Sequence, residues 1–172
     1  MSSDQSTFYV FYDLEFGPTT FNFLYTLICG ELARRELSQC EGIHVVFVPG
    51  PNEGFNKHTL YPTAKKQWRF WSILLPALGL LPTIRGFTLL PNRSAAESFL
   101  AEAGPNRFPL AYNLKNSADC CQINSTNLNY ALGFDMPSLQ APVLARDSVD
   151  QILGPLRNNK EIVTLTLRQS QH

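Results

Sequence analysis

Two acidic residues near the start of the chain are spaced as a catalytic carboxylate pair would be. The segment DLEFGPTT (residues 13–20) holds Asp13 and Glu15 two positions apart. In an extended strand this spacing places both side chains on one face, where two carboxylates can act together, whereas a turn separates them. The sequence is compatible with both geometries. Glu15, in the loop that follows the predicted strand, is a candidate catalytic residue.

A second group of titratable side chains lies in the loop PNEGFNKH (residues 51–58). Glu53, Lys57 and His58 supply a carboxylate, an amine and an imidazole, which are the groups that general acid–base catalysis uses. The same three residues can equally be solvated side chains of a polar loop. His58 is the second candidate catalytic residue.

The segment DLEFGPTT also has features of an anion-binding loop. Gly17 allows a ligand to approach the backbone closely, and Thr19 and Thr20 precede a predicted helix, whose N-terminal amides attract anions. The segment matches neither of the phosphate-binding motifs GxGxxG and GxxxxGK[ST]. A strand-to-helix turn capped by a threonine explains the same residues, so both interpretations stay open.

The segment KKQWRFW (residues 65–71) combines cations with both tryptophans of the chain. Arg69 can grip a phosphate, and Trp68 and Trp71 can stack on sugar rings. Because the two tryptophans are three positions apart in a predicted helix, packing together in the core is the preferred interpretation. The candidate ligand-binding residues are therefore Gly17, Thr19, Thr20 and Arg69.

Sequence patterns for metal binding and for nucleophilic catalysis are absent. The chain has three histidines and four cysteines without a CxxC motif or zinc-like spacing, and it has no GxSxG motif. Adjacent Cys120 and Cys121 cannot pair with each other without strain, so we expect reduced thiols. We expect no metal and no cofactor.

Strand and helix patterns alternate along the chain and would position these residues. This alternation predicts a three-layer, Rossmann-like α/β domain over residues 1–172, with a mostly parallel sheet covered by helices on both faces. Ligands of such folds bind beyond the carboxyl ends of the strands. Val10, Val46, Phe47 and Leu89 are expected in the buried layers. Strands are predicted at residues 8–12, 42–50 and 84–91, and helices at residues 21–37, 64–82 and 94–103.

The later elements are predicted from weaker patterns. Residues 107–113 predict a fourth strand, interrupted by a proline, and residues 162–167 predict a final strand. Ser94 is expected to cap the helix that ends at Gly104. Asp147 or Ser148 is expected to cap a helix from residue 146 onward.

Composition restricts the classes of partner. Lys plus Arg and Asp plus Glu each number 14, and this zero net charge argues against a dedicated nucleic-acid binder. Only 16% of the residues are charged and 44% are hydrophobic, so part of the surface is expected to be covered. The longest apolar run, residues 71–84, contains two prolines and is shorter than the ~20 residues of a membrane span. Without a signal peptide, we expect a cytoplasmic protein with no membrane span.

Three parts of the chain, taken together, are similar to a known family. FYDLEFGPTTFNFLYTLICGELARRE, then IHVVFVPGP with QWRFWSILLPALGLLP, and finally IVTLTLRQS resemble the N-terminal part of an uncharacterised bacterial glycosyltransferase-like family with two Rossmann-type domains. The resemblance implies that this half binds the sugar acceptor and that a second half binds the nucleotide sugar. It implies no cofactor beyond that donor.

The resemblance predicts an acceptor-side domain of a nucleotide-sugar-dependent glycosyltransferase-like protein that is inactive alone. Its expected partners are a glycan or sugar acceptor and a second domain, and the chain is either a fragment or a standalone relative. The strand at residues 162–167 would lead into the second half, and its open edge predicts self-association. The alternative is a non-catalytic α/β module for binding or assembly.

Overall fold

The computed structural model describes residues 7–37, 39–57, 61–115 and 129–153, and the structural statements below concern these residues. The chain forms two compact units, residues 1–140 and 141–172. The first unit contains the sheet. The second contributes one described helix, α6 (Val143–Leu153). A single domain over the whole chain stays a prediction.

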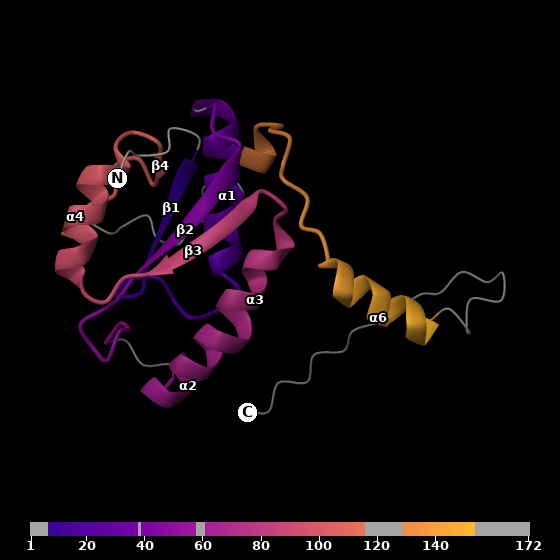
Figure 1. Cartoon of the computed structure of the whole chain (residues 1–172), viewed down its shortest axis with the longest axis horizontal. Coiled ribbons are helices and arrows are strands. Elements are labelled where there is room, and N and C mark those ends of the chain that lie inside the picture. The colour runs from indigo at the N-terminus through magenta and orange to yellow at the C-terminus, as the bar shows by residue number, and fades with distance from the viewer. Residues whose placement is uncertain (1–6, 38, 58–60, 116–128, 154–172) are drawn as a thin grey trace. The chain divides into compact units, whose positions relative to one another are not determined.

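The sheet of the first unit has four strands in the order β3-β2-β1-β4 (Figure 1). Each neighbouring pair runs parallel, with Val10 of β1 aligned with Val45 of β2 and with Phe108 of β4. This order is that of the first four strands of a Rossmann fold. The predicted Rossmann-like α/β class with a parallel sheet is therefore confirmed. The strands are β1 (Thr7–Asp13), β2 (Gly42–Val48), β3 (Ile84–Leu89) and β4 (Arg107–Phe108).

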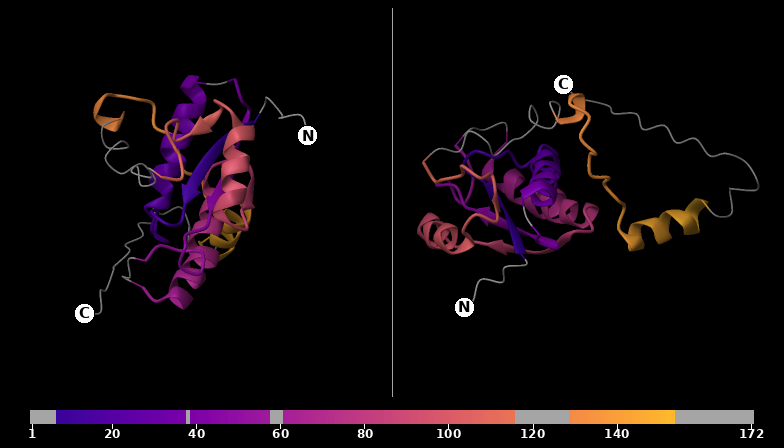
Figure 2. Two further views of the ribbon diagram at one scale, coloured as in Figure 1. Left: turned by 90° about the vertical axis from the view of Figure 1, so that its left-hand side faces the viewer. Right: turned by 90° about the horizontal axis from the view of Figure 1, so that it is seen from above.

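Helices cover both faces of this sheet, because the side chains of each strand alternate between two apolar layers. Phe8, Val10 and Tyr12 of β1 face the layer that contains α1 (Phe23–Leu37). Phe11 faces the opposite layer. Figures 1 and 2 show α4 on one side of the sheet and α1 on the other. The helix α4 (Arg93–Ala103) packs on the second layer through Ala96 and Ala103.

The second helical segment on the α1 side changes its winding before Pro76. Proline has no amide hydrogen, and its ring crowds the carbonyl four residues earlier, so the sequence predicts a kink there. The structure accommodates Pro76 with a π-turn, in which the amide of Leu75 donates to the carbonyl of Phe70, five residues back. The segment consists of α2 (Thr63–Arg69), the π-turn (Phe70–Leu74), α3 (Leu75–Ala77) and a 3₁₀ turn (Leu78–Leu80).

Two predictions about which side chains are buried are wrong. Leu89 is 42% exposed because β3 is an edge strand, although Val10, Val46 and Phe47 are buried as expected. The tryptophans Trp68 and Trp71 share a helix face, but that face is turned outward, and they are 58% and 60% exposed. Phe70 and Leu74, four residues apart, form the buried face of the helix instead.

The N-terminal ends of two helices also differ from prediction. The side chain of Asn92, and not Ser94, caps α4 by accepting a 2.8 Å hydrogen bond from the amide of Ala95. Asn92 lies one residue before the helix and therefore reaches its unpaired amides. The helix α6 begins at Val143, so that Asp147 and Ser148 lie within it and cannot cap it.

The ends of α4 and β4 follow from single residues. Gly104 ends α4 as predicted, with a positive φ of 61° that glycine adopts readily. The strand β4 is only two residues long, since Pro109 follows and has no amide hydrogen to pair. The predicted strand at residues 162–167 lies outside the described residues. In the described part of the chain, no helix has the length and apolar composition needed to cross a bilayer.

Candidate functional site

The carboxyl ends of the parallel strands meet at one edge of the sheet, the carboxyl edge. In Rossmann-like folds the ligand crevice lies at this edge, where the strand order reverses between β1 and β4. Asp13 is the last residue of β1, at this reversal, and its side chain is fully buried. A buried carboxylate requires charge compensation, so the groups around Asp13 determine what this position can do.

Asp13 is compensated by groups of its own chain. Arg93 forms a bidentate ion pair with it, Nη1 to Oδ1 and Nη2 to Oδ2, both at 2.9 Å. The hydroxyl of Tyr112 donates to Oδ2 at 2.7 Å, and the amide of Glu15 donates to Oδ1 at 3.0 Å. Side chains of the protein itself thus occupy the position at which Rossmann-like folds bind a ligand. We call Asp13, Glu15, Arg93 and Tyr112 the switch-point network.

Arg93, the first residue of α4, connects three loops at the carboxyl edge. Its guanidinium also donates to the carbonyls of Pro49, at 3.1 Å, and Leu114, at 3.0 Å. Partial burial acts to lower the pKa of Arg93, but the hydrogen bonds with Asp13 and the charges of Asp13 and Glu15 raise it overall. Arg93 is therefore a fixed cation that holds the loops after β1, β2 and β4 together.

The two carboxylates that the sequence places two positions apart do come together, but through a shared cation. Nη1 of Arg93 contacts Asp13 Oδ1 at 2.9 Å and Glu15 Oε2 at 3.0 Å. Glu15, a candidate catalytic residue, is thus engaged in an ion pair. His58, the other candidate, lies outside the described residues.

Gly17 has a packing role in the loop after β1. A Cβ atom at this position would lie 2.5 Å from Cζ of the Tyr12 ring, so a larger residue would displace the ring. The Tyr12 hydroxyl in turn donates to the carbonyl of Pro18 at 2.6 Å. The hydroxyl of Thr20 accepts from the amide of Asn22 at 3.3 Å, just before α1 begins. Packing and local hydrogen bonds account for the shape of this loop.

Thr19 and Arg69, two of the candidate ligand-binding residues, contact each other. Nε of Arg69 donates to the carbonyl of Thr19 at 2.6 Å, which joins the loop after β1 to α2. The Arg69 guanidinium lies over the Tyr61 ring, 4.5 Å from its centre, and the ammonium of Lys65 lies 5.1 Å from the same centre. Arg69 thus positions the loop and stacks on an aromatic ring.

Lys66 fixes the loop after β2. Its side chain is buried, and Nζ donates to the carbonyl of Asn56 at 2.7 Å and to the Asn56 side-chain oxygen at 2.9 Å. Within this loop, Gly50 and Gly54 form a backbone bridge. The loop that contains Glu53 is therefore held against α2.

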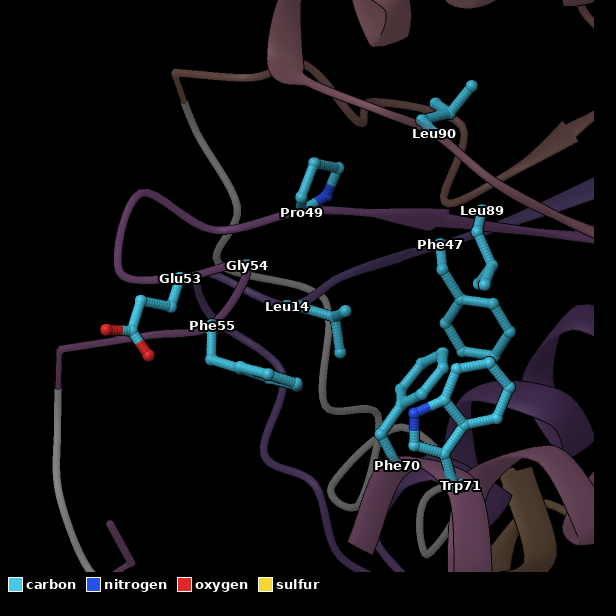
Figure 3. Close-up of a pocket in the computed structure, with 10 residues that line it drawn as sticks. All are labelled: Leu14, Phe47, Pro49, Glu53, Gly54, Phe55, Phe70, Trp71, Leu89 and Leu90. Atoms are coloured by element: carbon cyan, nitrogen blue, oxygen red, sulfur yellow. The ribbon is translucent and has the colours of Figure 1, made fainter. Parts of the chain in front are cut away.

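A pocket of about 200 Å³ lies beside the switch-point network at the carboxyl ends of β2 and β3. Figure 3 shows the rings of Phe47, Phe70 and Trp71 gathered near Leu89, and Glu53 at the other end with its carboxylate directed away from the rings. Glu53 is the one charged residue of the lining. The other lining residues are Leu14, Pro49, Gly54, Phe55 and Leu90.

No family model, curated protein or solved structure matches this chain. Among the residues that the structure describes, no three His, Cys, Asp or Glu side chains gather closely enough to hold a metal ion.

Sequence reasoning identified some of these residues and missed others. Glu53 was noted as a titratable loop residue, whereas Arg93 and Tyr112 were missed. Arg93 follows β3 at the start of a helix, and this position at the carboxyl edge was the available signal. None of Glu15, Gly17, Thr19, Thr20 and Arg69 lines the pocket.

Proposed function

We propose that this chain is the acceptor-side domain of a nucleotide-sugar-dependent glycosyltransferase-like protein, and that the pocket beside Trp71 receives the acceptor. The supporting observation is an aromatic-walled pocket at the carboxyl ends of β2 and β3, with Glu53 as the acidic residue of its lining. Aromatic rings pack on the apolar faces of sugar rings, and the exposed side chain of Glu53, once turned toward the pocket, can accept hydrogen bonds from hydroxyl groups.

The size of the pocket favours an acceptor group over a donor. Its volume of about 200 Å³ is below the roughly 300–1,000 Å³ of sites that enclose drug-sized ligands. A nucleotide sugar is larger than one ring and carries phosphates, while the lining contains no cation. The pocket therefore suits a single ring of an acceptor, with the donor bound by another domain.

The arrangement of carboxylates supports binding without transfer by this chain alone. Asp13 and Glu15 both pair with Arg93, so neither is placed as a proton acceptor for a ligand in the pocket. Glu53 is the remaining acidic residue at the pocket, and its carboxylate is directed away from the aromatic rings (Figure 3). The same observation favours the second candidate, a non-catalytic α/β binding module. Sugar transfer on addition of a donor-binding domain would separate the two.

The proposal is tested by screening simple methyl glycosides with saturation-transfer NMR. We expect saturable binding of at least one glycoside. Glu53→Gln should weaken it by roughly tenfold or more, because a hydrogen bond to a charged group contributes about 1.5–3 kcal/mol. Trp71→Ala should weaken binding further by removing the stacking surface.

The matched control is Glu41→Gln, which neutralises an exposed carboxylate outside the pocket. It should bind like the wild type. Failure of every glycoside to bind, or binding that neither Glu53→Gln nor Trp71→Ala weakens, would exclude the acceptor pocket. Transfer of sugar by the chain alone would contradict the division of acceptor and donor sites.

A further inference from the structure

Charge is unevenly distributed along this neutral chain. Between Gly54 and Ala96 there are six Lys and Arg residues and no Asp or Glu, so the remaining residues carry eight basic and 14 acidic side chains. The basic segment forms α2, the π-turn, α3 and β3. Lys65 and Arg85 of this segment are exposed to solvent. Lys66 is buried, and Arg93 is paired with Asp13 and Glu15. The charges that this segment exposes are therefore all positive.

Large apolar side chains are exposed on the same segment. Trp68 and Trp71 are 58% and 60% exposed on one face of the helix, and Phe87 and Leu89 are 44% and 42% exposed at alternate positions of β3. Trp71 and Leu89 both line the pocket (Figure 3). The ring of Phe87 lies 6.3 Å, centre to centre, from the ring of Phe47, which lines the same pocket.

We group these exposed residues as the α2–β3 surface. It consists of Trp68, Trp71, Phe87 and Leu89 with the cations Lys65 and Arg85. Exposed apolar side chains on neighbouring elements indicate a contact surface. Cations together with tryptophan, and without carboxylates in the same segment, are typical of protein surfaces that lie on a membrane.

We propose that the α2–β3 surface docks on an anionic lipid membrane, without crossing it. The indole rings of Trp68 and Trp71 are suited to the headgroup level, since they are apolar with one polar N–H. Lys65 and Arg85 complement the lipid phosphates. Charge complementarity favours this occupant over a second copy of the chain, whose surface would present the same positive charges.

Docking in this way has a consequence for the pocket. Trp71 and Leu89 belong both to the α2–β3 surface and to the pocket lining, so the pocket would open toward the lipid headgroups. The membrane proposal itself does not depend on what the pocket binds.

Intrinsic fluorescence provides a direct test, because Trp68 and Trp71 are the only tryptophans in the chain. The full chain is mixed with vesicles of phosphatidylcholine and phosphatidylglycerol in equal parts, or of phosphatidylcholine alone. We expect co-sedimentation and a blue shift of the emission with the anionic vesicles only. Added salt should weaken binding, since it screens exposed charges.

Two variants assign the binding to this surface and leave the pocket lining intact. Lys65→Glu should weaken binding to anionic vesicles by roughly tenfold or more, since each cation near the membrane contributes substantially. Trp68→Ala should reduce binding and remove part of the blue shift. Lys115→Glu makes the same charge change, and Tyr130→Ala removes an exposed aromatic ring, both outside the α2–β3 surface. These two controls should bind like the wild type.

Several outcomes would overturn the proposal. One is no binding to anionic vesicles at low salt by a chain with a folded circular-dichroism spectrum. Another is equal binding to both kinds of vesicle, and a third is binding that Lys65→Glu and Trp68→Ala leave unchanged. Self-association that shifts the emission without lipid, measured by sedimentation velocity, would assign the surface to a contact between copies.

Discussion

Two regions lie at the carboxyl edge of the sheet, and they differ in whether side chains of the chain fill them. At the reversal between β1 and β4, the switch-point network fills the crevice with side chains of the same chain. Beside β2 and β3, the pocket is open and mostly apolar. A backbone that offers a ligand site at one position can therefore fill that position with its own side chains and leave an open pocket at a neighbouring one.

The two regions also differ in the burial of their central side chains. Asp13 is buried and charged, so removal of its partner would leave an uncompensated charge in a nonpolar environment. Trp71 is more than half exposed, so its removal leaves no buried group unpaired. The first region should therefore respond to mutation in its stability, and the second in its binding.

The largest effect should follow from Arg93→Leu. This change leaves the Asp13 carboxylate buried without its cation, and we expect a loss of about 3–5 kcal/mol in the free energy of unfolding. The measurement is urea denaturation followed by circular dichroism. Asp13→Asn combined with Arg93→Leu should restore part of the loss, because the buried charge is then absent. A loss no larger than that of the exposed control Arg85→Leu would contradict the assignment of the network.

A third region, at the amino ends of the strands, extends this comparison. Glu31 of α1 is buried, but its partners Arg34 and Arg35 reach solvent. The Thr83 hydroxyl also donates to it at 2.9 Å. Burial acts to raise the pKa of Glu31, but the hydrogen bonds from Arg34, Arg35 and Thr83 lower it below its usual value of 4.5.

Glu31→Gln should cost about 1–3 kcal/mol at neutral pH, less than Arg93→Leu, because its cationic partners can be solvated. A lowered pKa means that this contribution is present above pH 4.5 and is lost as the pH falls through the pKa of the folded state. The stability difference between wild type and Glu31→Gln should therefore shrink on acidification. Urea denaturation over a pH series measures it, with the exposed Glu97→Gln as control. A difference that stays constant below pH 4.5 would contradict the ion pairs of Glu31.

The smallest effect on stability should come from Trp71→Ala, at the open pocket. We expect a change within about 0.5 kcal/mol, as for other surface substitutions. The matched variant is Phe70→Ala, one residue earlier and buried, which should cost about 3–5 kcal/mol. Thermal melts compare the two variants. A similar loss for both would mean that Trp71 is part of the core.

The sequence allowed the fold class to be predicted because strand and helix patterns are local. The apolar runs of β1 and β2 indicate buried parallel strands, and Gly104 indicates a helix end. The outward direction of Trp68 and Trp71 was not predictable in this way, because spacing shows that two residues share a face but not which face is buried.

The switch-point network could not be read from local patterns either. Arg93 and Tyr112 are 80 and 99 residues from Asp13 in the chain, and only the sheet topology brings them together. The paired acidic residues were visible in the sequence, but the cation they share was not. The glycosyltransferase-like function rests on resemblance and pocket chemistry and stays a proposal.

The π-turn before Pro76 determines which side chains of α2 are presented to solvent. Each residue of an α-helix advances the chain by about 100° around the axis, and a π-turn holds one residue more than an α-helical turn. Deleting Ser72 from the turn would therefore rotate α2 relative to α3 by about that angle. Trp68 would no longer share an exposed face with Trp71, and Lys66 would lose its hydrogen bonds to Asn56. In evolutionary terms, the loss or gain of a single codon there would change which side chains of α2 face solvent, with no substitution at any other position.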